Sequence, residues 1–66
     1  MQYREGKVMS KVGGYYLDDG EVLRISAGDV VFYVVDEQKY GVAMDYIISR
    51  GLQLNIIEVV NMTELI

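Results

Sequence analysis

Two hydrophobic segments and the turn between them decide the fold, and together they read Val22-Leu23-Arg24-Ile25-Ser26-Ala27-Gly28-Asp29-Val30-Val31-Phe32-Tyr33-Val34-Val35. In the first segment, Leu23 and Ile25 alternate with Arg24, which is typical of a strand with one buried face. Gly28-Asp29 is a turn dipeptide between the two. The second segment is apolar on both faces if it is extended, so both faces need cover. The stretch therefore predicts two strands joined by a turn.

Glycine and aspartate mark the other boundaries. Asp18-Asp19-Gly20 predicts a tight turn of the primed hairpin type, because Asp-Gly supplies the positive φ angles that such turns require. Residues 36–39, Asp36-Glu37-Gln38-Lys39, predict a third turn, which is charged and exposed. Valine, isoleucine and tyrosine fill the segments between. We expect strands near residues 7–12, 14–17, 21–26, 30–36 and 52–60.

Residues 40–50 fit two structures. As a strand, they place Tyr40, Val42, Met44, Tyr46 and Ile48 on one apolar face. As a helix, they form a polar stripe of three residues, and Arg50-Gly51 resembles a helix end with a left-handed glycine cap. The β-branched and aromatic content favours a strand that closes in one helical turn, and the helix remains the alternative.

The stretch from Leu23 to Val34 resembles the central hairpin of SH3-like barrels, in which Gly-Asp precedes a hydrophobic strand. Residues 41–47 are similar to the late SH3 segment that runs from a glycine to a tyrosine. The resemblance implies a mainly β fold, a small five-stranded antiparallel barrel; the residues themselves leave open whether this barrel includes one short helix near 42–50. The alternative is an α+β fold, an antiparallel sheet with one helix. The resemblance also places Tyr46 in a groove, although the groove tryptophan and proline of peptide-binding SH3 domains have no counterpart here.

Residues 1–66 are expected to form a single small domain. The chain contains neither cysteine nor histidine, so its core is not supplemented by a disulfide or by a metal bound through those ligands. Apolar residues make up 52% of the sequence and must supply most of the stability. We expect a largely buried core formed by Leu23, Ile25, Phe32, Val34, Leu54 and Ile56.

The charges are mostly acidic and are scattered. Ten acidic and six basic residues give a net charge of −4, and the basic residues form no cluster. Binding to nucleic acid and to an anionic membrane surface is therefore disfavoured. No stretch reaches the roughly 18 apolar residues of a membrane span. The first seven residues lack the apolar core of a signal peptide, so we expect a cytoplasmic location.

The sequence offers no recognisable catalytic group. Histidine, the commonest general base, is absent, as is any cysteine nucleophile. Ser10 and Lys11 are adjacent and would point to opposite faces of a strand. The cluster of Asp18, Asp19 and Glu21 lacks the alternating ligands of a calcium loop. We therefore expect no enzymatic activity, no cofactor and no metal.

Binding to another protein is the remaining class of function. Tyrosine is enriched in binding patches because it combines an apolar ring with a polar hydroxyl. The candidate partner-binding residues are exposed tyrosines and the carboxylates near them: Tyr15, Tyr16, Asp18, Asp19, Glu21, Tyr40 and Tyr46.

The sequence thus indicates a protein-interaction module, a small intracellular regulator or inhibitor that docks on a larger protein. A phage or mobile-element origin would fit this role. The first alternative is a structural subunit of a symmetric assembly such as a virion, and the second is an acidic mimic of nucleic acid. The two-sided hydrophobic segment at Val30–Val35 predicts a homodimer or higher homo-oligomer, unless residues 42–50 cover its outer face.

Overall fold

The computed structural model describes residues 10–65. Its elements are β1 (Ser10–Val12), β2 (Tyr15–Leu17), β3 (Glu21–Ala27), β4 (Val30–Val34), α1 (Glu37–Ser49), β5 (Leu54–Asn61) and the 3-10 helix η1 (Met62–Leu65). All five predicted strands are present, and within the described residues their ends differ from the predicted ones by at most two residues. Residues 7–9 of the first predicted strand lie outside the described residues.

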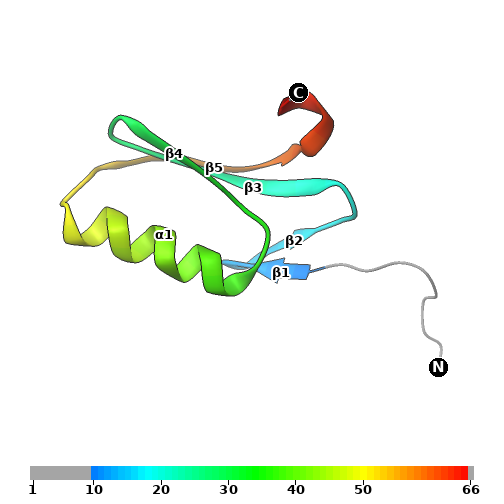
Figure 1. Ribbon diagram of the computed structural model, residues 1–66, viewed down its shortest axis with the longest axis horizontal. Helices are drawn as coiled ribbons and strands as arrows, with labels where there is room; N and C mark the ends of the chain where they lie inside the picture. The colour runs from blue at the N-terminus through cyan, green and yellow to red at the C-terminus, as the bar shows by residue number, and fades with distance from the viewer. Residues whose placement is uncertain (1–9, 66) are drawn as a thin grey trace.

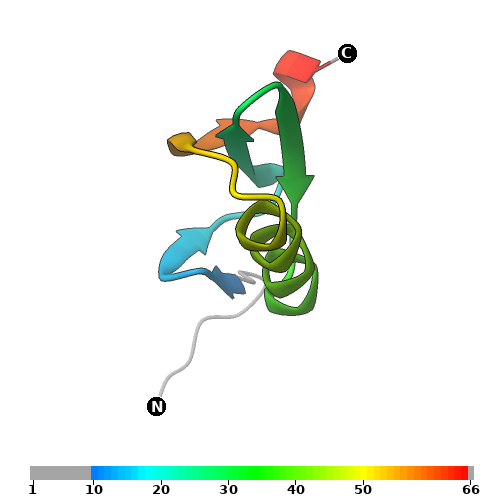
Figure 2. The ribbon, with the colours of Figure 1, turned by 90° about the vertical axis from the view of Figure 1, so that its left-hand side faces the viewer.

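The described strands form two antiparallel sheets. One sheet contains β4, β3 and β5 in that order, and the other is the β1–β2 hairpin. Helix α1 and the hairpin lie on the same side of the larger sheet, and η1 lies beyond its other side (Figures 1 and 2). The fold is therefore mainly β with one helix. In the described part of the chain the strands do not close into the expected barrel.

The turns explain why two sheets form. Gly13 and Gly14 both have positive φ, 57° and 90°, so they make the two-residue turn that joins β1 to β2. At Asp18-Asp19-Gly20 a turn also forms, and the Glu21 N–H donates to the Asp18 carbonyl over 3.0 Å. Only Gly20 there has positive φ, however, and a primed turn of this type needs two such residues. The expected hairpin is consequently wrong, and the chain passes from one sheet to the other.

Residues 40–49 belong to helix α1 and Arg50 is its C-cap, so the preferred strand interpretation is wrong. Asp36, expected in an exposed turn, is the N-cap of α1, and its side chain accepts the Lys39 N–H over 2.8 Å. At the other end, Gly51 adopts φ 64°, and the Leu52 N–H donates to the Ile47 carbonyl over 3.0 Å. This is the predicted glycine cap. Caps at both ends, together with burial of one face, outweigh the β propensity of the segment.

Removal of the N-cap should weaken the helix measurably. We expect Asp36→Ala to lower the free energy of unfolding by about 1 kcal/mol, because the Lys39 N–H loses its acceptor. Urea denaturation followed by circular dichroism measures the change. Gln38→Ala, an exposed change in the first turn of the same helix, is the control and should cost nothing. Equal losses in the two variants would contradict the cap.

The core lies between the larger sheet, α1 and the hairpin. Its buried residues are Val12, Leu17, Leu23, Ile25, Ala27, Val34, Ala43 and Ile47. Leu23, Ile25 and Val34 were predicted, and Phe32 is only half-buried. Leu54 and Ile56 were expected in the core, but they are 42% and 45% exposed. Ile56 pairs with Ser26, whose neighbours Ile25 and Ala27 point into the core. Ile56 therefore lies on the face of the sheet that α1 and the hairpin do not cover, which we call the uncovered face.

Candidate functional site

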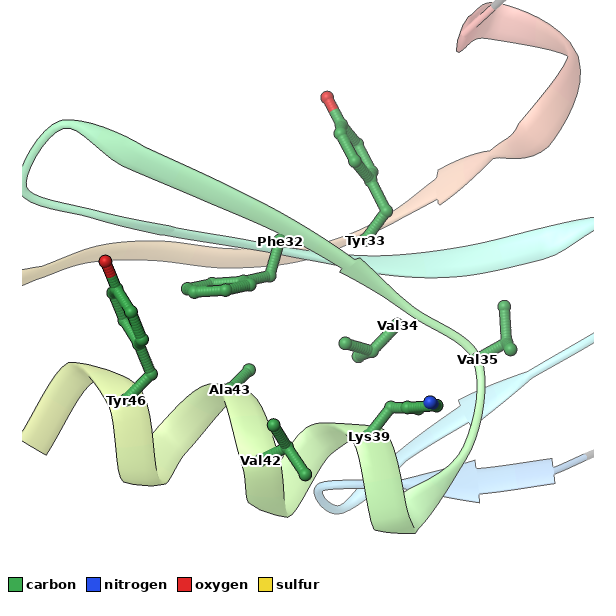
Figure 3. Close-up of a pocket in the computed structure, with 8 residues that line it drawn as sticks. All are labelled: Phe32, Tyr33, Val34, Val35, Lys39, Val42, Ala43 and Tyr46. Carbon is green, nitrogen blue, oxygen red and sulfur yellow. The ribbon is translucent and has the colours of Figure 1, made fainter.

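An apolar groove runs between β4 and α1, and we call it the β4–α1 groove. It has a volume of about 390 Å³. Figure 3 shows Phe32 and Val34 pointing from the strand toward the helix, while Tyr33 points away. The apolar residues that line the groove are Phe32, Val34, Val35, Val42, Ala43 and Tyr46. Concave, mostly apolar sites of this size are typical of binding sites.

The two ends of the groove differ. At one end, the rings of Phe32 and Tyr46 meet edge to face, with centroids 5.5 Å apart, and the Arg50 guanidinium lies 4.2 Å from the Tyr46 ring centroid. At the other end lies Lys39, the only charged residue among the described residues that line the groove (Figure 3). The groove therefore combines an aromatic end with a cationic end.

The edge of β4 next to the groove is open. Ala27 and Val30 flank the two-residue turn between β3 and β4, so they are a hydrogen-bonded pair, and bonded pairs then alternate along the hairpin. The intervening residues Val31 and Tyr33 direct their N–H and C=O groups away from β3. No strand of the described residues pairs with this edge. These backbone groups are available to an added strand.

The opposite edge of the sheet, β5, is built differently. Its eight residues include Asn55, Glu58 and Asn61, whereas all five residues of β4 are apolar. Charged and polar residues on an edge strand discourage pairing with another chain. Strand β4 carries no charged side chain, so of the two edge strands it is the one less protected against pairing with another chain.

The uncovered face of the larger sheet carries an ion pair. The Arg24 guanidinium lies 2.7 Å from a Glu58 carboxylate oxygen, and both side chains are partly exposed. The hydrogen bond to Glu58, and next the one to Tyr33, raise the pKa of Arg24 above its usual value. An exposed pair of this kind contributes little to stability. The Arg24–Glu58 pair lies among the exposed side chains of Val31, Tyr33 and Ile56.

The structure brings the three predicted carboxylates together at a second, smaller hollow of about 220 Å³, which is distinct from the β4–α1 groove but shares Val35 with it. Glu21 accepts the Asp18 N–H over 2.7 Å, and Asp18 accepts the Asp19 N–H over 2.8 Å. These side chains stabilise the turn that leads into β3. Within the described residues, no group of acidic side chains is arranged to hold a metal ion.

The four predicted tyrosines do not form one patch. Tyr15 and Tyr16 are exposed on β2, where the Lys11 ammonium lies 5.6 Å from the Tyr16 ring centroid. Tyr40 packs partly buried against the core. Only Tyr46, the tyrosine that the SH3 resemblance places in a groove, lines the β4–α1 groove. Hence one of the seven candidate residues belongs to this site.

The other groove residues were not predicted as a site. Phe32 and Val34 were assigned to the core, and Lys39 to a turn. A signal is nevertheless present in the helix interpretation, because Lys39, Val42 and Tyr46 are spaced by three and four residues and so lie along one helix face. That stripe becomes visible only once residues 37–49 are known to be helical.

Comparison with the known protein families, with curated proteins and with solved structures finds no match to this chain. The groove must therefore be interpreted from its own chemistry. In the described residues, no helix is both long enough and apolar enough to cross a membrane.

Proposed function

We propose that this protein is a non-enzymatic protein-interaction module that binds an extended segment of a partner protein at the β4 edge. The observation that carries the proposal is a wholly apolar strand, β4, whose outer edge pairs with no other described strand and lies directly beside an apolar groove. An extended segment that adds to a sheet edge gains affinity from main-chain hydrogen bonds and specificity from alternate side chains in a pocket. A small regulator or inhibitor that docks on a larger protein would act in this way.

The geometry defines what such a segment would contact. Its backbone would bond to the outward N–H and C=O groups of Val31 and Tyr33. Because side chains of a strand alternate, every second one would point into the β4–α1 groove, on the side of Phe32 and Val34. The remaining ones would extend the uncovered face of the sheet.

The lining of the groove sets the preferred ligand chemistry. The aromatic end, formed by Phe32 and Tyr46, suits an aliphatic or aromatic side chain. Lys39 at the other end favours a carboxylate. The ligand is therefore an extended segment whose groove-facing side chains include an apolar residue and an acidic residue.

A selection from random peptides tests the proposal without a known partner. Displayed 12-residue peptides are selected on the protein, and the enriched sequences are synthesised and titrated. We expect an alternating apolar pattern with an acidic residue, and amide chemical-shift changes centred on β4 and α1. Val42→Glu should weaken binding about tenfold or more, because it places a negative charge in the apolar groove beside Lys39 and repels the ligand carboxylate.

Ile48→Glu is the matched control. Ile48 is on the same helix and is 71% exposed, but it does not line the groove. This variant should bind the selected peptides as the unmodified protein does. Selected peptides whose shift changes map to β5, or whose affinity is unchanged by Val42→Glu, would refute the proposed site.

A further inference from the structure

We propose that the β4 edge also pairs with the β4 edge of a second copy of this chain, giving a two-fold dimer in which the β4–α1 groove is closed. The dimer itself is inferred independently, whereas its role as a concentration-dependent switch rests on the proposed function. In this scheme the β4–α1 groove is open in the monomer, which can bind a ligand, and closed in the dimer, which cannot.

The edge strand meets the requirements of a two-fold contact. Such a contact uses the same surface on both copies, so that surface must complement itself. Two antiparallel β4 strands do so, because the outward N–H and C=O groups of Val31 and Tyr33 are both donors and acceptors. The absence of a charged side chain from Val30 to Val34 removes the usual obstacle to edge pairing.

Charge complementarity on α1 selects a second copy as the occupant. Lys39, Val42 and Asp45 are spaced by three residues and form a row on the helix. Val42 is 62% exposed although it lines the groove. The two-fold axis of an antiparallel β4–β4 pair is perpendicular to the sheet. If this axis also brings Val42 beside Val42 of the second copy, the two α1 helices are antiparallel. Lys39 then lies beside Asp45 of the second copy, and the same pair recurs on the other side of the axis.

The same arrangement buries more of the groove side of the hydrophobic segment, whereas Val31 and Tyr33 on the opposite face stay exposed. Helix α1 covers the Phe32 and Val34 side of β4, but it leaves the groove along the strand edge uncovered. A second copy would fill that gap with its own β4 and Val42. Because ligand and second copy compete for one edge, a higher protein concentration would lower the apparent affinity for a selected peptide.

Sedimentation equilibrium across a dilution series, on the unmodified chain without any ligand, tests the dimer. We expect self-association at micromolar concentration, with mass falling to that of a monomer on dilution. Lys39→Glu and Asp45→Lys should each raise the dissociation constant about tenfold, because two attractive pairs become repulsive. In the described part of the chain neither residue forms an ion pair, so both variants should stay folded, as circular dichroism will show.

Two combinations of these charge changes test whether Lys39 pairs with Asp45 of the second copy. An equimolar mixture of Lys39→Glu and Asp45→Lys should form a heterodimer, because each repulsive pair is replaced by an attractive one. The double variant K39E/D45K should form homodimers again. A monomer at every concentration would overturn the dimer, as would single variants that associate like the unmodified chain. Peptide titrations below the dimer dissociation constant test the proposed function separately, so failure of one does not imply failure of the other.

Discussion

Leu23→Ala should abolish the folded state. Leu23 lies on the central strand β3, is fully buried, and pairs with Val34 on one side and Val59 on the other. Truncation of a buried leucine to alanine costs about 2–5 kcal/mol, because transfer free energy is lost and a cavity remains. A domain of this size has only about 3–5 kcal/mol of stability in total. We expect circular dichroism to show no cooperative thermal transition above room temperature.

Leu54→Ala is the control, because the chemical change is identical and the strand is in the same sheet. Leu54 is 42% exposed on the edge strand β5, so its truncation removes little buried surface. This variant should melt cooperatively, within a few degrees of the unmodified protein. A cooperative transition of Leu23→Ala at a similar temperature would contradict the position of the core.

Gly13→Ala should have the second-largest effect. Gly13 has φ 57°, a region that costs an L-residue about 1–2 kcal/mol. A Cβ atom there would also lie closer than 3.0 Å to three atoms of the Tyr40 ring, which packs against the core. The ring or the turn must therefore move. We expect a total loss of about 3 kcal/mol of unfolding free energy, most of the stability of the domain, measured by urea denaturation.

Gly14→Ala separates backbone strain from the steric clash. Gly14 has φ 90°, but no heavy atom lies within 4 Å of a Cβ atom built there. This variant should show the strain alone and remain folded. In a Tyr40→Ala background the extra cost of Gly13→Ala should largely disappear, because the clashing ring is gone. An unchanged difference between the two glycine variants in that background would exclude Tyr40 as its cause.

The strands could be predicted because their signals are local. Valine, isoleucine and tyrosine between glycine-containing turns mark all five strands, and Gly28-Asp29 marks the hairpin of β3 and β4. Gly51 was identified as a left-handed helix cap for the same reason. A turn depends on the φ angles of a few neighbouring residues, and glycine supplies those angles wherever the chain needs them.

The helix could not be decided locally. Residues 40–50 have an apolar face under either periodicity, and their β-branched and aromatic side chains favour a strand. Two features reverse this: the hydrogen bond from the Lys39 N–H to Asp36, and burial of Ala43 and Ile47 against the sheet and hairpin. The second is a contact between segments distant in the sequence, so no local pattern reports it.

The candidate site was harder to predict than the fold. Tyrosine and carboxylate enrichment pointed to seven residues, and only Tyr46 lines the β4–α1 groove. The groove exists because α1 crosses beside an edge strand, and the sequence does not state which strand lies at an edge. Val42 and Val35 become groove residues only through that arrangement.

The sequence by itself determined a small β-rich chain with a hydrophobic hairpin at residues 21–35, no histidine or cysteine chemistry and an acidic balance. These properties follow from side-chain chemistry and from interactions between neighbours in the chain. Only the tertiary structure decided that the strands form two sheets, that residues 37–49 are helical, and that β4 has an open edge beside an apolar groove. The physical reason is that edge position and burial depend on which distant segments pack together, and packing free energy can override local propensity.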